Sequence, residues 1–382
     1  MTMNKPCWVL NGTTLVMGGA LQACVNFIIE AAKDECIDWR FLVSLQIKQQ
    51  LLASDSTLPP DKLQVFPVSP AKNRAMRADI KQAVESISPV VVFTFFGPSY
   101  IEFNCQHVLG FADSWVLNSN KYAISTLKGL SSKIRTYLLG VYKIYWLKKA
   151  DYWVVETSVA KSGLARAINC NLHDVAVIAN GCHDVFRGLQ VLEFSPDHFS
   201  IRLLCLSAYY PHKNFELIPE VAKALTILQP DRKFIFVLSL SLSRSEVKAI
   251  SDRAVELGVA DCLEFIGAVD LDKVPELYGQ SHMAFIPTLL EAFSAAYSEA
   301  MTCRLPIVTS DLDFARAVCV DGALYFEPKN AQAAAKAIVE CVQDANLRER
   351  TINNASLVAS TLPNAYEKYM QYKEFIAKKI TN

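Results

Sequence analysis

The stretch MAFIPTLLEAFSAAYSEAMTCRLPIVTS, residues 283–310, has a pattern that predicts a strand, a loop, a helix and a second strand. Its two ends are short apolar runs typical of buried strands, and the alanine-rich residues between them favour a helix. Ser294 is a good helix N-cap, which places Glu291 in the loop and Glu299 in the second helical turn. The stretch therefore predicts one strand–helix–strand unit of a parallel sheet.

The same alternation of strand and helix runs through the whole chain of 382 residues. Continuous apolar strands separated by helices are typical of parallel sheets that are covered on both faces. The pattern restarts after residue 200, which predicts two doubly wound α/β domains facing across a cleft, followed by a helical stretch over 331–382. The expected strands are 7–11, 39–44, 63–68, 90–96, 115–119, 152–157 and 175–180 in the first half, and 201–207, 233–239, 263–269, 283–288, 306–310 and 323–328 in the second.

The composition narrows the class of protein. The chain has 38 basic and 38 acidic residues, so no overall field favours nucleic acid as a partner. Its eleven cysteines include no C-x-x-C pair, which predicts reduced thiols in a cytoplasmic protein. The chain has no run of 18 apolar residues, so we predict no membrane span. Asn11 to Thr14 interrupt the apolar N-terminal stretch, so we expect a strand, a loop and a helix there instead of a signal peptide.

Glu291 and Glu299 lie eight positions apart, and both carry candidate chemistry. A helical rise of 1.5 Å per residue would separate them by about 12 Å, too far for the paired carboxylates of a glycosidase. We therefore expect different roles on one extended ligand. The amides of residues 295–297 at the helix start would bind phosphate, and Glu299 would accept hydrogen bonds from ribose hydroxyls. The alternative is an ordinary amphipathic helix with a solvated glutamate.

Lys213 lies in the segment YPHKN, residues 210–214, after the first strand of the second domain. Ligands of doubly wound folds bind at the carboxyl ends of the central strands, and a lysine there can contact a diphosphate as a point charge. A surface lysine before a helix is the structural alternative.

These segments, taken together, resemble glycosyltransferase family 4, the retaining GT-B-fold enzymes that use nucleotide-sugars. The resemblance rests on PTLLEAFSAAYSEAMTCRLPIVTSD (287–311), on YPHKN, and on the shorter segments FIGAV (265–269), ALYFEP (323–328) and VIANG (177–181). It is continuous over about residues 150–345 and weaker before that range. It implies an N-terminal Rossmann-like acceptor domain (1–190), a C-terminal Rossmann-like nucleotide-sugar domain (191–364) and a final helix (365–382) that packs back on the first domain.

The resemblance also implies roles for individual residues. It makes Glu299 the ribose ligand, Glu291 a contact to the donor sugar, and Lys213 the cation that stabilises the departing diphosphate. His107 matches a histidine near the sugar, although a lone histidine in an apolar segment is also a common core residue. The nucleotide-sugar contacts are then completed by Ala292, Phe293, Ser294, Ala295, Gly267, Ser207, Gly18 and Gly19.

The chain departs from the family pattern at several of these positions. The family has Gly-Arg where this chain has Leu206 and Ser207, so the second diphosphate contact is left to His212 or Arg304. The family's EGFG is EAFS here, with Ala292 and Ser294 in place of glycines. These departures keep open the alternative of a catalytically silent partner subunit.

Two further segments suggest partners. The triplets at 270–272 and 311–313 have the Asp-x-Asp pattern of a metal site, but we expect Asp270 or Asp272 to cap the helix near Val274, and we predict no metal. Residues 115–149 hold seven basic residues, no acidic one and several aromatic residues, which suits an anionic membrane surface. A solvated basic helix face is the alternative.

The sequence thus predicts a metal-independent, retaining glycosyltransferase without a cofactor, which moves a sugar from a nucleotide-diphosphate donor to a glycan or lipid-linked acceptor. The expected setting is bacterial surface polysaccharide, O-antigen or lipopolysaccharide biosynthesis. The expected location is the cytoplasm, peripherally at the inner face of the cytoplasmic membrane. A GT-B-fold sugar-nucleotide epimerase or hydrolase is the alternative among enzymes.

Overall fold

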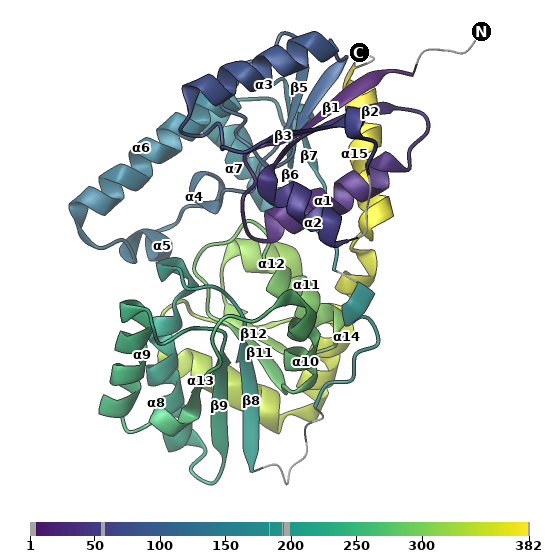
Figure 1. Ribbon diagram of the computed structural model, residues 1–382. Coiled ribbons are helices and arrows are strands. Elements are labelled where there is room, and N and C mark those ends of the chain that lie inside the picture. Colours follow the sequence, from purple (N-terminus) through teal and green to yellow (C-terminus); the bar gives the residue numbers. More distant parts are fainter. Residues whose placement is uncertain (1–4, 55–57, 183, 193, 195–198, 381–382) are drawn as a thin grey trace. The chain divides into compact units, whose positions relative to one another are not determined.

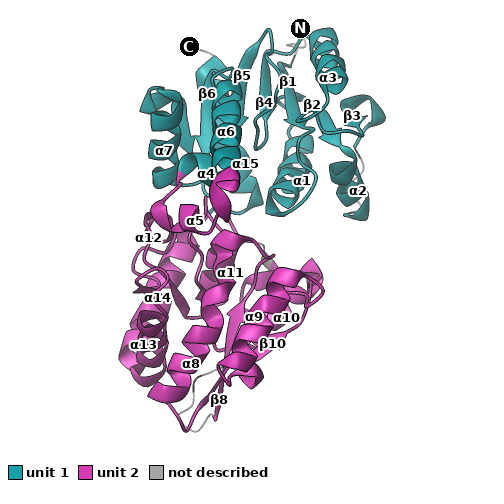
Figure 2. Ribbon diagram, turned by 90° about the vertical axis from the view of Figure 1, so that its left-hand side faces the viewer, with its two compact units in different colours: residues 1–117, 134–179, 363–382 teal, residues 118–133, 180–362 magenta. Residues whose placement is uncertain are grey.

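The computed structural model describes residues 5–54, 58–182, 184–192, 194 and 199–380, and it divides into two compact units (Figures 1 and 2). The first unit comprises residues 1–117, 134–179 and 363–382, and the second comprises 118–133 and 180–362. The boundary at 179 lies before the expected boundary at 190. The segment 118–133 clusters with the second unit, although it precedes the main part of that unit in the sequence.

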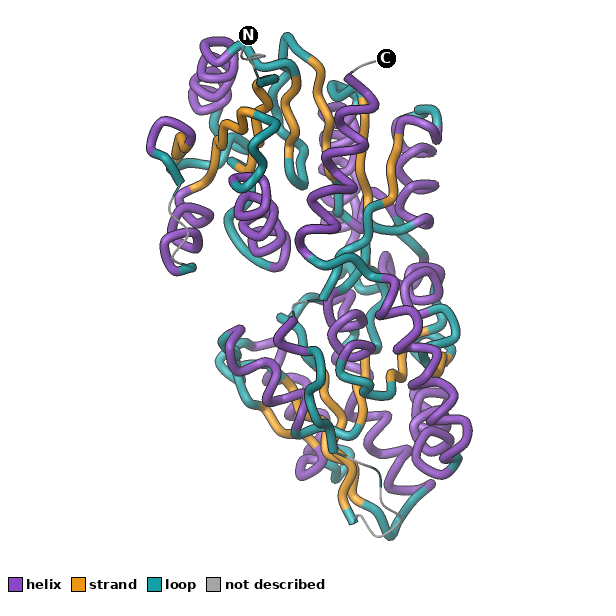
Figure 3. Tube along the Cα trace, turned by 90° about the vertical axis from the view of Figure 1, so that its right-hand side faces the viewer, coloured by secondary structure: helices purple, strands orange, loops and turns teal. Residues whose placement is uncertain are grey.

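The first unit contains a fully parallel sheet with the strand order β3-β2-β1-β4-β5-β6-β7 among the described residues. Figure 3 shows helices running alongside these strands. The strands are β1 (Cys7–Gly12), β2 (Asp38–Ser44), β3 (Leu63–Phe66), β4 (Val91–Thr94), β5 (Gln106–Gly110), β6 (Tyr152–Val155) and β7 (Val175–Val177). The helices are α1 (Gly19–Ala32), α2 (Leu45–Ala53), α3 (Arg74–Ile87), α4 (Ser114–Leu117), α7 (Ser158–Ile168) and α15 (Ala365–Ile380).

The core of the first unit is rich in aromatic residues, and α15 completes it. Tyr369 and Tyr372 of α15 pack against Phe27 of α1, with ring centroids 5.3 and 5.6 Å apart. The indole of Trp39 donates a hydrogen bond to the Tyr369 hydroxyl at 3.2 Å. Burial of such large side chains contributes on the order of 1.5–3 kcal/mol each. The predicted return of the last helix to the first domain is therefore confirmed.

The second unit contains another fully parallel sheet, with the order β10-β9-β8-β11-β12-β13 in the described part of the chain. Its strands are β8 (Ser200–Cys205), β9 (Lys233–Leu238), β10 (Leu263–Phe265), β11 (Met283–Ile286), β12 (Ile307–Ser310) and β13 (Leu324–Phe326). Its helices are α5 (Lys121–Ser125), α8 (Ile218–Leu228), α9 (Ser245–Glu256), α10 (Val274–Gly279), α11 (Ala295–Thr302), α12 (Asp313–Cys319), α13 (Ala331–Gln343) and α14 (Ala345–Thr361). The helix α6 (Gly129–Leu147) begins in the second unit and continues into the first.

Two parallel α/β sheets confirm the predicted fold class, but one predicted strand is wrong. Residues 115–119 do not form a strand, because Ser114–Leu117 is the short helix α4. The carboxylate of Asp113 accepts a hydrogen bond from the amide of Trp115 at 3.0 Å, and its carbonyl accepts from Val116 and Leu117, so Asp113 starts a helical turn. The strand that occupies this place in the order is β5, which the sequence pattern did not predict.

Candidate functional site

The candidate site is built around β8 and β11, which are neighbours in the second sheet. From β8 the chain proceeds to β9 and β10 on one side, and β11 leads to β12 and β13 on the other. The carboxyl ends of β8 and β11 therefore form a topological switch point, the position where doubly wound folds bind ligands. The loop after β8 carries Lys213, and the loop after β11 carries Glu291.

Lys213 and Glu291 form a direct ion pair. The Nζ atom of Lys213 lies 2.5 Å from Oε1 of Glu291, and the two side chains are 17% and 12% exposed. The hydroxyl of Thr288 donates a second hydrogen bond to the same carboxylate oxygen at 3.0 Å. Two residues 78 positions apart in the sequence are thus held as one charged, mostly buried pair.

Hydrogen bonds to backbone carbonyls join the two loops that carry this pair. The amide of Leu289 donates to the carbonyl of His212 at 2.7 Å, and the side-chain amide of Asn214 donates to the carbonyl of Pro287 at 3.2 Å. Asn214 has a left-handed backbone conformation (φ 59°), which suits asparagine and ends the 3-10 turn Pro211–Lys213. The position of Lys213 is therefore set by the backbone on both sides of the pair.

Glu299 lies in the second turn of α11, as predicted, and its carboxylate is held by a tyrosine. The hydroxyl of Tyr278, on α10, donates to Oε2 of Glu299 at 2.9 Å. Burial raises the pKa of the Glu299 carboxyl above its ordinary value, and the hydrogen bond from Tyr278 opposes this shift. A carboxylate in this environment gains from further hydrogen-bond donors, such as the hydroxyls of a ligand.

The start of α11 differs in detail from the sequence expectation. Ser294 occupies the N-cap position, but its side chain makes no capping hydrogen bond, and its backbone lies at φ 69° and ψ 110°. The amide of Tyr297 donates to the carbonyl of Ser294 at 3.2 Å, so it is not a free phosphate donor. Residues other than glycine rarely adopt this backbone conformation, whereas glycine adopts it readily. The strain falls at one of the positions where the family pattern has glycine.

We expect Ser294→Gly to stabilise the protein by about 1 kcal/mol, because glycine relieves the positive φ without losing a cap hydrogen bond. Chemical denaturation of the wild-type and variant proteins measures this difference. Ser298→Gly is the matched control. Ser298 lies inside α11, where glycine should destabilise by up to about 1 kcal/mol. A Ser294→Gly variant that is less stable than the wild type would contradict the claim that the backbone at Ser294 is strained.

The remaining predicted residues of the second unit surround these loops. Ala292 and Phe293 are buried, and Ala295 is exposed as the first residue of α11. Ser207 follows β8, and its amide donates to the hydroxyl of Ser239 at 2.9 Å. Gly267 follows β10 at φ 77°, and a side chain built there would meet no atom within 4 Å. This glycine is needed for its backbone conformation.

His212 and Arg304 were the candidates to replace the family's missing arginine. The guanidinium of Arg304 donates to Asn353 and Ser356 of α14, at 3.0 Å each, so it is held by a different element. His212 lies next to Lys213, and its ring is stacked on Tyr210 with centroids 5.6 Å apart. Of the two, His212 is the residue that the structure places beside the ion pair.

Three predicted site residues belong to the first unit. His107 lies on β5, is 1% exposed, and its Nε2 atom is 2.8 Å from the Thr94 hydroxyl. Burial lowers the pKa of His107 to about 4, which keeps the ring neutral. Gly18 and Gly19 stand at the start of α1, and Gly18 has φ 78°. His107 thus occupies a core position, and its predicted catalytic role stays a prediction.

The aspartate triplets have other partners. Asp311 forms a bidentate pair with Arg316 at 2.7 and 2.9 Å, and Asp270 lies 3.4 Å from Lys273. The expected cap on α10 is wrong, since Lys273 occupies the N-cap position of that helix and no side chain caps it. Among the described residues no group of three His, Cys, Asp or Glu side chains is placed to hold a metal ion.

Several residues of the site were missed by sequence reasoning. Thr288 and Tyr278 hold the two glutamates. Thr288 lies in the quoted stretch 287–311, but no role was assigned to it, and Tyr278 lies in no motif that the sequence analysis used. Asn118 and Asn120 were missed as well. Their side-chain amides donate to the carbonyls of Glu291 and Leu289 at 2.8 Å each, which ties the segment 118–133 to the loop after β11. Two asparagines close together between helices were the available signal.

Comparison with known proteins finds a family model that matches the part of the chain that carries this site. Residues 196–358 match the family model described as glycosyl transferases group 1. The matched range includes Lys213, Glu291 and Glu299. The match confirms the group 1 resemblance for this part of the chain.

Individual relatives are more distant. The chain is 22% identical over 201 residues to O-antigen chain mannosyltransferase RfbU of Salmonella typhimurium, covering 52% of this chain and 54% of the relative. It is 26% identical over 147 residues to O-antigen chain mannosyltransferase B of Escherichia coli, covering 38% of each. The alignments thus span about a third to a half of these relatives. The crystal structure of Anabaena Alr3699/HepE with UDP and glucose has a TM-score of 0.70 at 17% identity, covering 98% and 100% of the two chains. That likeness, together with the two parallel sheets, confirms the GT-B fold.

Proposed function

We propose that this protein is a retaining glycosyltransferase that moves a sugar from a nucleotide-diphosphate sugar to a hydroxyl of a glycan or lipid-linked acceptor. The observation that carries the proposal is the Lys213–Glu291 pair at the carboxyl ends of β8 and β11, inside the matched family domain. The O-antigen relatives support a role in bacterial surface polysaccharide or lipopolysaccharide synthesis. The UDP and glucose in the Anabaena structure support a nucleotide-sugar donor.

The residues of the site have distinct roles in the proposed reaction. Lys213 neutralises charge that develops on the departing diphosphate, and the backbone at the start of α11 contacts the phosphates. Glu291 orients the donor sugar while its charge is balanced by Lys213. Glu299 accepts hydrogen bonds from the ribose. The departing diphosphate itself accepts the acceptor proton on the same face of the sugar, so the protein contributes orientation and charge stabilisation.

A thermal-shift screen against nucleotide-sugars tests the proposal, because a ligand at 100 times its Kd stabilises a folded protein by about 2.7 kcal/mol. We expect at least one UDP- or GDP-sugar to raise the melting temperature, and we expect transfer to continue in the presence of EDTA. Donor breakdown at an equal rate without any acceptor would favour the epimerase or hydrolase instead. Donor binding without turnover across an acceptor panel would favour the silent subunit.

A lipid-linked acceptor would lie at a membrane surface, and we propose that α6 contacts this surface. Figure 1 shows the course of α6. Ile134, Tyr137, Leu138, Val141 and Tyr145 are each 46–70% exposed, and their spacing in the sequence places them on one side of this helix. Exposed basic residues accompany this stripe at positions 133, 135 and 148. An apolar stripe with flanking cations suits the interface of an anionic bilayer. No helix in the described part of the chain is long and apolar enough to cross a bilayer.

We expect the protein to sediment with vesicles that contain phosphatidylglycerol and to bind pure phosphatidylcholine vesicles more weakly. Leu138→Glu places a charge in the stripe and should reduce binding to the anionic vesicles at least fivefold. Leu357→Glu, at a similarly exposed leucine on α14, is the control and should bind normally. Equal binding by all three proteins would contradict the docking role of α6.

A further inference from the structure

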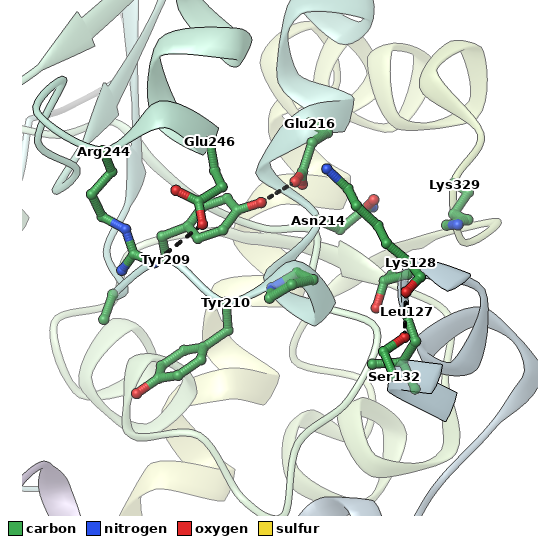
Figure 4. A pocket seen from close by; sticks show the side chains of 13 residues that line it. Leu127, Lys128, Ser132, Tyr209, Tyr210, Asn214, Glu216, Arg244, Glu246 and Lys329 are labelled. Atoms are coloured by element: carbon green, nitrogen blue, oxygen red, sulfur yellow. Dashed lines mark hydrogen bonds and ion pairs between the residues drawn. The ribbon is translucent and has the colours of Figure 1, made fainter. Parts of the chain in front are cut away.

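A second feature of the second unit is a pocket of about 590 Å³ beside the turn that carries Lys213 (Figure 4). The loop after β8, the start of α9, Lys329 and residues 126–128 with Ser132 form its wall. Its volume lies in the range of about 300–1,000 Å³ typical of small-molecule sites. Lys213, Glu291 and Glu299 do not line it, so it is separate from the proposed donor contacts.

The pocket presents a fixed aromatic ring. Tyr210 is 49% exposed, and its ring is stacked on His212 at an interplanar angle of 17°. Behind it, Tyr209 is buried, its hydroxyl donates to Glu216 at 2.5 Å, and the guanidinium of Arg244 lies 5.1 Å from its ring centroid. Tyrosine offers a large amphipathic surface at little conformational cost. An exposed, stacked tyrosine is suited to the apolar face of a sugar ring.

The polar groups of the pocket include both hydrogen-bond donors and acceptors. Glu216 and Glu246 supply carboxylate oxygens, whereas Lys128, Arg244 and Lys329 supply N–H donors. Figure 4 shows Lys128 extending from one side toward the side that carries Glu216. Two carboxylates would repel a phosphate, and three cations would repel a cationic ligand. The hydroxyls of a neutral ligand can donate to the carboxylates and accept from the cationic side chains.

The pocket is also linked to the proposed donor site. The segment 118–133 contributes residues 126–128 and Ser132 to the wall, and its Asn118 and Asn120 donate to the loop that carries Glu291. At the other wall, Pro211 begins the 3-10 turn that ends at Lys213. Both walls are therefore continuous with the loops of the ion pair.

We infer that this pocket binds a neutral hexose unit of the acceptor oligosaccharide, with the sugar ring against Tyr210. That the bound saccharide is the acceptor rests on the proposed glycosyltransferase function. That the pocket binds a saccharide rests on the side chains that line it. It assigns to the second unit a share of acceptor binding that the sequence analysis had given to the first domain alone.

The test is isothermal titration calorimetry of the full chain with maltotriose, mannotriose and galactotriose. We expect at least one trisaccharide to bind, Tyr210→Ala to weaken that binding at least tenfold, and Glu216→Gln to weaken it severalfold. Tyr366→Ala removes an exposed tyrosine that does not line the pocket and should leave binding unchanged. Absence of binding by all three trisaccharides, or equal binding by Tyr210→Ala and the wild type, would overturn the inference.

Donor binding separates this inference from the proposed function. The thermal shift produced by nucleotide-sugars should be the same in Tyr210→Ala as in the wild type. Trisaccharide binding that depends on Tyr210, with no response to any nucleotide-sugar, would leave the saccharide pocket in place and remove the proposed function. Saturable binding of inorganic phosphate that Tyr210→Ala abolishes would overturn the neutral-hexose inference.

Discussion

Lys213→Ala should lower turnover at least tenfold. The lysine pairs with Glu291, and loss of a charge-assisted hydrogen bond to a diphosphate removes about 1.5–3 kcal/mol. The same change also leaves the mostly buried Glu291 carboxylate without its cation, which destabilises the fold. Turnover and the free energy of unfolding must therefore be measured together.

The double variant Lys213→Met with Glu291→Gln separates these two effects. It replaces the ion pair by neutral side chains of similar size, so we expect stability near that of the wild type. Turnover should stay at least tenfold low, because the double variant lacks both the cation for the diphosphate and the carboxylate that orients the donor sugar. Lys233→Ala is the control, since its pair with Asp261 is more exposed and contributes at most about 1 kcal/mol. Recovery of turnover in the double variant would show that Lys213 serves only the fold.

The strands of the second unit were predicted well from the sequence. Most contain an apolar run bounded by turn residues, and buried parallel strands have this pattern whatever their neighbours are. The strand β5 was not predicted, because it lacks such an apolar run at its start. It begins with the polar residues Gln106 and His107, and His107 is accommodated in the core by Thr94 on β4. That partner is a property of the folded sheet, which no local pattern contains.

The sequence predicted which residues belong to the site better than it predicted the contacts between them. Spacing placed Glu291 in a loop and Glu299 on a helix, and both positions are observed. The resemblance gave a common ligand to Lys213 and Glu291, but their direct pairing depends on β8 lying next to β11. The strained backbone at Ser294 was also hidden, because serine at the start of a helix is normally a sign of a side-chain cap.

These observations bear on the positions at which this chain departs from the family pattern that it resembles. Ser294 adopts a backbone conformation that glycine would favour, at the expense of local strain. The position of the missing arginine is Ser207, whose amide is bonded to Ser239. Compared with the family pattern, one positive charge is absent at this position, which places greater demand on Lys213 in the proposed reaction.

Glu299→Gln should have opposite effects on stability and on donor binding. Burial raises the pKa of Glu299 in the folded protein, so the folded state holds its proton more tightly than the unfolded state does. The contribution of this group to stability is therefore complete below its unfolded pKa and is lost as the pH rises through the folded pKa. Glutamine has no charge to desolvate and can still accept from Tyr278. We expect Glu299→Gln to be more stable than the wild type at pH 8, with a smaller difference at pH 4.

Donor affinity should change in the other direction. A neutral amide is a weaker acceptor for two ribose hydroxyls than a carboxylate, so Glu299→Gln should weaken nucleotide-sugar binding about tenfold, or about 1.4 kcal/mol. In the wild type, binding should also weaken as the pH falls through the raised pKa of Glu299, whereas the variant should lose this pH dependence. Calorimetric titration at pH 4 and pH 8 measures both, with the exposed Glu276→Gln on α10 as control. A variant that gains stability and keeps full donor affinity would show that Glu299 does not contact the donor.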